Sequence, residues 1–423
     1  MLLTLRQQLT KFAHMLQEEL FPTVEAEVGE LSEPAKRLTA VLAMIPLRRF
    51  VPVSKGWNGR PPKDRYCIAC SFVAKVVYNF PRTRDLLDRL QNDPQLRMIC
   101  GWKPGEKIPH ESTFSRAFAE FAQMELPQFV HEALIRETQK DRLIGPIARD
   151  STAIEVRERF PHTTPQSAPG KPNQPRVQLA VAQPAQPGSA GPGSAEQSPA
   201  ESVQAPPPAP PTSSKPRPSK RWKGGQPKRA PKEDTRLHRQ RSMSLDAMLE
   251  ELPCHCDIAA KQSSKGHQQF WRGYKLHLDV ADGQIPISAV LTSASVHDSQ
   301  VAIPLATMTA QRVTSLYDVM DSAYDAHEIH EHSRELGHVP IVDPANRGRK
   351  TKNVIVPGKQ PRQFTWAEEQ RFKERTMVER VNGRLKDEFG ARYVRVRGAV
   401  KVMAHLMFGV LVLTVDQLMR LSE

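Results

Sequence analysis

The chain has 423 residues, of which 39% are hydrophobic, so it is long enough for two or three domains with buried cores. Its formal net charge of +14 indicates a polyanionic partner, nucleic acid before an anionic membrane, because Lys and Arg bind phosphates with release of counterions. Five cysteines in a chain of this size argue against a disulfide framework and favour a reducing, cytosolic compartment.

Two apolar stretches near the ends of the chain do not read as membrane segments. The N-terminal stretch is broken by Arg6, Lys11 and an acidic pair, which is not the pattern of a signal peptide. The most apolar run, 400–421, contains Lys401 and Asp416. We therefore expect a buried helix there and no membrane partner.

Residues 1–140 carry helical periodicity in several stretches separated by Pro-containing and Gly-containing breaks. The predicted helices are 34–44, 65–80, 84–90 and 112–121. This pattern predicts an all-helical N-terminal domain.

The helix expected at 112–121 carries phenylalanines on one side and begins after a tight loop, with Ser112 as its expected N-cap. Arg116 then faces outward. This arrangement is typical of the recognition half of a helix-turn-helix, which would make Arg116 a DNA contact. An ordinary packed helix with one exposed arginine is equally compatible with the pattern.

Residues 144–156 have the β-branched content and the turn boundary of a strand. Asp150 lies in phase with the more apolar positions of that strand, and burial of an unpaired charge is costly. Asp150 is therefore either a salt-bridged structural residue or a metal ligand at the edge of an active cleft.

Between about 161 and 241 the composition changes to Pro, Gly, Ser, Ala and Gln, which predicts a disordered insertion. Its C-terminal part gathers Lys and Arg around Trp222, which favours non-specific DNA binding, although a solubilising linker has a similar composition. Because the segment separates one strand from the next, we interpret it as a surface insertion within a single domain, 141–423.

Two cysteine pairs, Cys67 with Cys70 and Cys254 with Cys256, raise the hypothesis of a zinc site. The first pair lies on the apolar part of a predicted helix, where cysteine is commonly a small buried residue. Structural zinc is therefore the weaker interpretation.

Two strands follow the insertion, at 273–280 and 285–292. Together with the strand of Asp150 they predict an antiparallel three-stranded meander. Asp298 is placed to cap the next helix, at 301–311.

The strand predicted at 315–320 ends at Asp321. Ligands collect at the carboxyl ends of strands in α/β sheets, although an ordinary turn residue is the simpler alternative. Asp325 and Glu328 predict a capping box for the next helix, and 338–342 predicts another short strand.

Residues 372–389 read as one amphipathic helix. Its apolar stripe, suited to packing on a sheet or helix, consists of Val378, Val381, Leu385 and Phe389. Its second stripe consists of Arg375, Glu379, Asn382 and Lys386. Taken alone, the second stripe is explained by a solvated face with an ion pair between Arg375 and Glu379.

The spacing from Phe372 through Arg375 and Glu379 to Lys386 resembles the Tyr-Arg-Glu-Lys signature of DDE-type transposases from bacterial insertion sequences, with Phe in place of Tyr. The stretches GYKLH, ASVHDS and DSAYDAH resemble the catalytic region of the same family. The run from GRPPKDR to IPHESTFSRAF resembles its N-terminal region, which implies binding of element ends by residues 1–140.

The resemblance implies a ribonuclease-H-like catalytic domain, in which a mixed five-stranded sheet is flanked by helices. It implies that Asp150, Asp321 and Glu379 are the catalytic, metal-binding acids, while Arg375 and Lys386 hold DNA phosphates. Carboxylate oxygens are the ligands that Mg²⁺ prefers, and Mn²⁺ is expected to substitute. Further DNA contacts are expected at Tyr324, Asn382, Lys275 and Arg116.

The implied function is transposition: cleavage at the element's terminal inverted repeats and attack of the freed 3′-hydroxyl on target DNA by two-metal-ion phosphoryl transfer. We expect double-stranded DNA as the partner, a homodimer in the synaptic complex, and a cytoplasmic, nucleoid-associated location. Two alternatives stay open: a catalytically silent DNA-binding protein derived from a transposase, and a ribonuclease-H-like nuclease that does not join strands.

Overall fold

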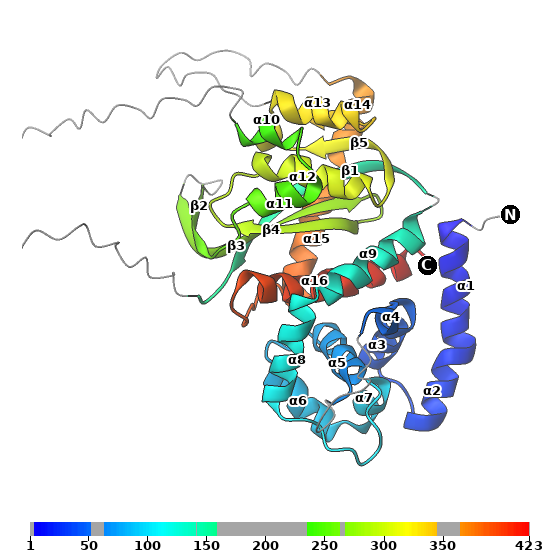
Figure 1. Cartoon of the computed structure of the whole chain (residues 1–423). Coiled ribbons are helices and arrows are strands. Elements are labelled where there is room, and N and C mark those ends of the chain that lie inside the picture. The colour runs from blue at the N-terminus through cyan, green and yellow to red at the C-terminus, as the bar shows by residue number, and fades with distance from the viewer. Residues whose placement is uncertain are drawn as a thin grey trace, which may run out of the picture. The chain divides into compact units, whose positions relative to one another are not determined.

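The structure is a computed structural model (Figure 1). It describes residues 4–51, 63–140, 142–158, 235–262, 267–344 and 364–422. The predictions for 161–234, including disorder and the role of Trp222, lie outside the described residues. The described residues all belong to one compact unit.

The N-terminal region is helical, as predicted. Its elements are α1 (Leu5–Met15), a π-helical turn (Leu16–Leu20), α2 (Phe21–Val28), α3 (Glu33–Met44), α4 (Leu47–Phe50), α5 (Arg65–Val77), α6 (Thr83–Asn92), α7 (Pro94–Ile99), α8 (Glu111–Gln123) and α9 (Leu126–Gln139). Ser112 does not cap α8, because the helix begins one residue earlier. The N-cap is His110, whose Nδ1 accepts the Ser112 backbone N–H at 3.2 Å.

The C-terminal region contains a mixed sheet. Its strands are β1 (Leu143–Glu155), β2 (Asp257–Gln262), β3 (Gln268–Ala281), β4 (Ile285–Ser293), β5 (Thr314–Met320) and β6 (Val339–Val342). Their order is β2-β3-β1-β5-β6, with β4 paired to β3. β1, β3 and β4 form the predicted antiparallel meander, whereas β5 is parallel to β1 and β6 is parallel to β5.

The sheet has six strands, so the predicted number of five is wrong. The reason is the length of β3, which pairs with β2 up to Gly273 and with β4 from Tyr274 onward. At the change of partner the chains approach closely: a Cβ on Gly273, whose φ is +153°, would lie 2.0 Å from the carbonyl oxygen of Ile154. Only glycine fits this position without a backbone shift.

The helices of the C-terminal region are α10 (Arg236–Gln240), α11 (Leu245–Glu251), α12 (Ser299–Ala310), a 3₁₀ turn (Ser322–Tyr324), α13 (His327–Glu335), α14 (Trp366–Lys373), α15 (Thr376–Asp387) and α16 (Ala399–Arg420). One face of the sheet is covered by α12, and α15 and α16 pack against the other (Figure 1). α10 falls inside the stretch predicted as disordered. It forms because Thr235 caps it by accepting the His238 backbone N–H at 3.4 Å.

The single helix predicted at 372–389 is two helices, because its apolar residues pack against different surfaces. Phe372 lies on α14 and packs with Val319 and Ile341. The buried stripe that begins at Val378 lies on α15, which contacts β1 and β3. One straight helix cannot reach both surfaces, so the chain breaks at Arg375.

The apolar run predicted at 400–421 forms α16, which is long and apolar enough to cross a membrane but is mostly buried inside the protein. It contacts α3, α5, α8 and α9 of the helical region as well as β4. Phe408 lies 6.0 Å from Phe72 and 6.3 Å from Phe118, measured between ring centroids. α16 is thus a core helix that joins the two regions.

Candidate active site

The sheet brings Asp150 and Asp321 to the same place. β1 and β5 are parallel, and Ala148 lies opposite Val319. The same register carries the two acids, each two residues further along, to the edge where β5 ends. Asp321 is fixed there because its Oδ1 accepts the Ala323 backbone N–H at 2.9 Å.

Both carboxylates lie where a negative charge is unfavourable. Burial, with the charges of Asp321 and Asp298, raises the pKa of Asp150 to about 6 against the opposing charge of Arg375. Burial and the charge of Asp298 also raise the pKa of Asp321. Paired carboxylates that resist ionisation are stabilised by a nearby cation.

Glu379 does not join the other two acids in a metal-holding group. Its side chain is 49% exposed, and its Oε1 lies 2.8 Å from a terminal guanidinium nitrogen of Arg375. Among the described residues, no three His, Cys, Asp or Glu side chains are arranged to hold a metal ion. The ion pair considered as the simpler explanation of the polar stripe is therefore present.

Arg375 is the cation that the three acids share. It bonds to Glu379, and its charge favours the ionised forms of Asp150 and Asp321. It occupies this position because it is the N-cap of α15, at the break after α14. The donor set fits a divalent ion in part: Asp150 and Asp321 offer two carboxylates at one edge of the sheet, whereas Glu379 would have to exchange its arginine partner for the ion.

Asp298, predicted only as a helix cap, is a further acid beside this pair. It is the N-cap residue of α12, but its side chain makes no capping hydrogen bond. Its Oδ1 instead accepts a hydrogen bond from Lys275 Nζ at 2.9 Å. Although burial disfavours its charge, His277 and Lys275 hold the pKa of Asp298 below its usual range.

Three of the predicted DNA contacts have side chains that are buried or already paired. Lys275 is 16% exposed and holds both Asp298 and the carbonyl oxygen of Val296. The Tyr324 ring is 0% exposed, so it has no surface on which a base can stack. Asn382 is buried as well, because it lies on the core-facing side of α15.

Two other predicted contacts lie at the surface. Arg116 is exposed on α8, whose phenylalanines are buried as predicted. Lys386 is half-buried on α15. Its pKa is lowered by burial and by the positive charges of Lys261 and Arg392.

A buried ionic cluster lies next to Asp150 in the sequence but on the other face of β1. Arg149 makes two hydrogen bonds of 2.8 Å with Asp279 and lies 3.6 Å from Asp318. Asp318 also lies 3.1 Å from His338 Nδ1. The available sequence signal was a charged residue among the apolar residues of each of three strands, β1, β3 and β5.

Cys67 and Cys70 have the surroundings of buried, protonated thiols, whereas Cys254 of the second pair is exposed. The thiol of Cys67 donates to the carbonyl oxygen of Gly101 at 3.2 Å. Burial raises the pKa of Cys67 and of Cys70 to about 12, so neither is a thiolate near neutral pH. Both features agree with the interpretation of these residues as ordinary core side chains.

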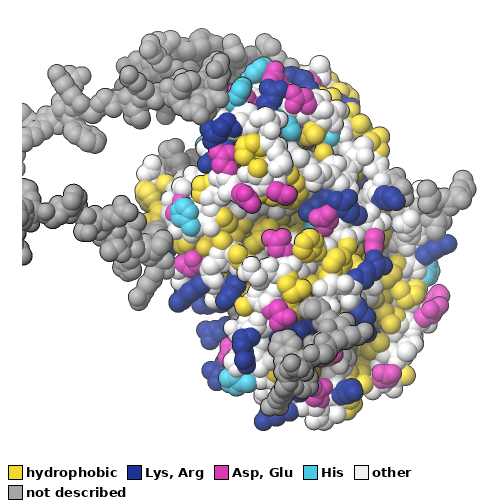
Figure 2. All heavy atoms as spheres, in the orientation of Figure 1, with side chains coloured by type: hydrophobic (Ala, Val, Ile, Leu, Met, Phe, Trp, Pro, Cys, Tyr) yellow, Lys and Arg dark blue, Asp and Glu magenta, His cyan; other side chains and the backbone are white. Residues whose placement is uncertain are grey.

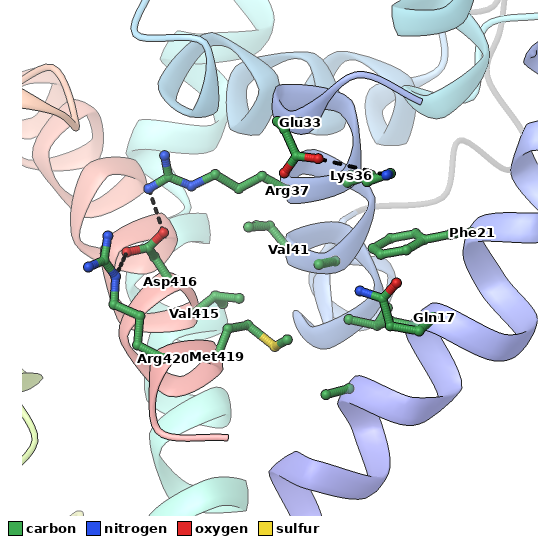
Figure 3. A pocket seen from close by; sticks show the side chains of 13 residues that line it. Gln17, Phe21, Glu33, Lys36, Arg37, Val41, Val415, Asp416, Met419 and Arg420 are labelled. Atoms are coloured by element: carbon green, nitrogen blue, oxygen red, sulfur yellow. Dashed lines mark hydrogen bonds and ion pairs between the residues drawn. The ribbon is translucent and has the colours of Figure 1, made fainter. Parts of the chain in front are cut away.

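A cavity of about 540 Å³ lies among α1, α3 and the C-terminal part of α16 (Figure 3). On its wall Asp416 pairs with Arg37 at 2.6 Å and with Arg420 at 3.0 Å. Neither Asp150, Asp321 nor Glu379 lines it. The candidate active site is therefore the edge of the sheet and not this cavity.

Two family models match the chain. Residues 216–415 match a transposase DDE domain, and residues 26–120 match a transposase domain (DUF772). The first match contains Asp321 and Glu379 but begins after Asp150, which lies on the other side of the insertion. No match was found among curated proteins or among solved structures. The two family matches support a DDE-type transposase.

Proposed function

We propose that the protein is a transposase that cuts DNA at the ends of its insertion sequence and joins the 3′-hydroxyl ends to target DNA. The observation that carries this proposal is the convergence of Asp150 and Asp321 at one sheet edge, beside Arg375. The mixed sheet, with β1 between β3 and β5, is consistent with the proposed ribonuclease-H-like catalytic domain.

Asp150, Asp321 and Glu379 are the residues that would hold Mg²⁺, or Mn²⁺ in its place. Bound ions activate a water or a 3′-hydroxyl and stabilise the leaving oxygen of an in-line displacement. The two aspartates provide fixed oxygens on the sheet. Glu379 is exposed and can turn away from Arg375, which then becomes available to a DNA phosphate.

The helical region would bind the terminal inverted repeats through α8 and Arg116, and residues 141–423 would carry out cleavage and joining. Two copies acting together on the two ends would form the synaptic complex. The net charge of +14 suits this double-stranded DNA partner and a location at the nucleoid.

The first test is the substitution Glu379→Gln. We expect it to abolish Mg²⁺-dependent nicking of a duplex that carries the flanking inverted repeats, and to leave DNA affinity near that of the wild type, because only the metal-ligand charge is removed. The matched control is Glu374→Gln, which removes an exposed acid at the break between α14 and α15 and should cut normally.

The products separate the alternatives. Joining of pre-cleaved ends to a plasmid requires a transposase, whereas cutting without joining indicates a nuclease. Binding of the repeats with no cutting in either metal would indicate a silent DNA-binding protein. Cleavage by Glu379→Gln at the wild-type rate would show that Glu379 is not a catalytic metal ligand.

A further inference from the structure

The segment 392–401, here called the basic strap, follows α15, continues into the first turn of α16 and is anchored to the sheet. Val394 is buried and forms a parallel bridge with Val156 at the end of β1. The carboxylate of Glu158 accepts the Gly398 backbone N–H at 2.6 Å. The strap thus has a fixed backbone, and its anchoring residues alternate with outward-facing ones.

The outward-facing side chains of the basic strap are mostly unpaired cations. Arg395, Arg397 and Lys401 are exposed, and within the described part of the chain Arg392 is the residue of the strap that forms an ion pair, with Asp387. Tyr393, among them, is 54% exposed. An aromatic residue among free arginines is typical of a surface that binds nucleic acid.

Cations from two other elements converge on the basic strap. Burial lowers the pKa of Lys386 of α15, and the positive charges of Lys261 of β2 and of Arg392, which itself pairs with Asp387, lower it further. The nearby acids Glu155 and Asp387 offset this repulsion only in part. A polyanion bound here would relieve the repulsion between the cations.

The basic strap also lies between the candidate active site and α8. Val396 of the strap and Ser115 of α8 line one small cavity of about 130 Å³. Along α15, Lys386 is about 10 Å from Glu379, since a helix rises 1.5 Å per residue. Figure 2 shows Lys and Arg side chains gathered at the lower left, over the region of α8 and the start of α16.

We propose that the basic strap, with Lys386 and Lys261, binds the phosphate backbone of duplex DNA between the active site and α8, and that Tyr393 contacts a sugar or base. The choice of DNA as the polyanion rests on the proposed function. The basic strap would hold the duplex in register, so that an end bound at α8 reaches the acids.

The test is the double substitution Arg395→Ala/Arg397→Ala, measured by equilibrium binding to a duplex of arbitrary sequence in EDTA over a series of KCl concentrations. The slope of log K against log salt is negative, and each lost phosphate contact reduces its magnitude by about 0.9. We therefore expect the magnitude to be smaller by about 1.8 in the double variant. At about 0.1 M salt the affinity should fall about 10- to 100-fold.

The matched control is Lys140→Ala/Arg334→Ala, which removes the same charge from exposed positions after α9 and on α13. It should bind nearly as the wild type does. Arg395→Lys/Arg397→Lys should retain the slope, because phosphate accepts either cation, and thermal unfolding checks that each variant folds. The proposal would be overturned if the two alanine variants lost DNA affinity equally. It would also be overturned if Arg395→Ala/Arg397→Ala lost none. Because binding in EDTA is measured without catalysis, the result can be interpreted even if the protein proves to have no transposase activity.

Discussion

At the scale of single residues, Asp150 combines a chemical role with a cost to stability. Its pKa of about 6 in the folded protein lies above the ordinary value of 3.8, so the fold prefers the protonated form. Stability contributed by that preference is present below about pH 4 and is lost as the pH rises to about 6. At neutral pH the ionised carboxylate of Asp150 therefore lowers the free energy of unfolding.

Asp150→Asn should consequently stabilise the protein at pH 8, by about 1–3 kcal/mol, and have little effect at pH 4. Urea unfolding at the two pH values measures this difference. Added Mg²⁺ should raise the melting temperature of the wild type at pH 8 and leave that of Asp150→Asn unchanged, because only the wild type keeps the full set of ligands. Equal metal responses in the two proteins would count against the metal site.

The sequence predicted the positions of those site residues whose surroundings depend on the local sequence pattern. Asp150 and Asp321 were recognisable because an acid in an apolar strand and an acid at a strand end are both unusual. The burial of Tyr324 and the pairing of Lys275 with Asp298 and Val296 could not be predicted, because both depend on how neighbouring elements pack. The position of Asp298 beside the other two aspartates depends on the same packing.

At the scale of elements, the cluster of Arg149, Asp279 and Asp318 ties three neighbouring strands together. Arg149→Ala leaves two buried carboxylates without their cation, so we expect a loss of about 3–5 kcal/mol in the free energy of unfolding. The control is Arg142→Ala, which breaks a partly exposed pair with Asp282 and should cost about 1 kcal/mol or less. Denaturant titration compares the two. Similar losses of unfolding free energy in the two variants would show that the buried cluster stabilises the sheet no more than a partly exposed ion pair does.

Element types followed from periodicity more reliably than element boundaries did. The meander and the four N-terminal helices with predicted ranges, α3, α5, α6 and α8, lie close to their predicted positions, because alternation and helical spacing are local properties. The break at Arg375 and the pairing of β2 with the outer half of β3 depend on which distant surface each residue meets. The sequence pattern within 372–389 does not show where the helix breaks.

At the scale of the whole molecule, α16 makes the helical region and the sheet share one hydrophobic core. A fragment of residues 1–140 would expose the faces of α5 and α8 that now cover Phe408, so we expect it not to melt cooperatively. Adding the segment 364–423 in trans should restore helical structure to it. Circular dichroism and calorimetry measure both effects. A sharp transition for 1–140 alone would show that the helical region folds independently.

The position of α16 after the other described elements in the sequence also affects folding during synthesis. The ribosome produces α3 to α9 first, yet the surface that these helices offer to α16 stays open until the last turns of that helix are made. At roughly 5–20 residues per second, this interval lasts on the order of tens of seconds. Until α16 has been made, a nascent chain therefore leaves Phe118 of α8 without its packing partner Phe408, and this apolar surface is accessible to chaperones.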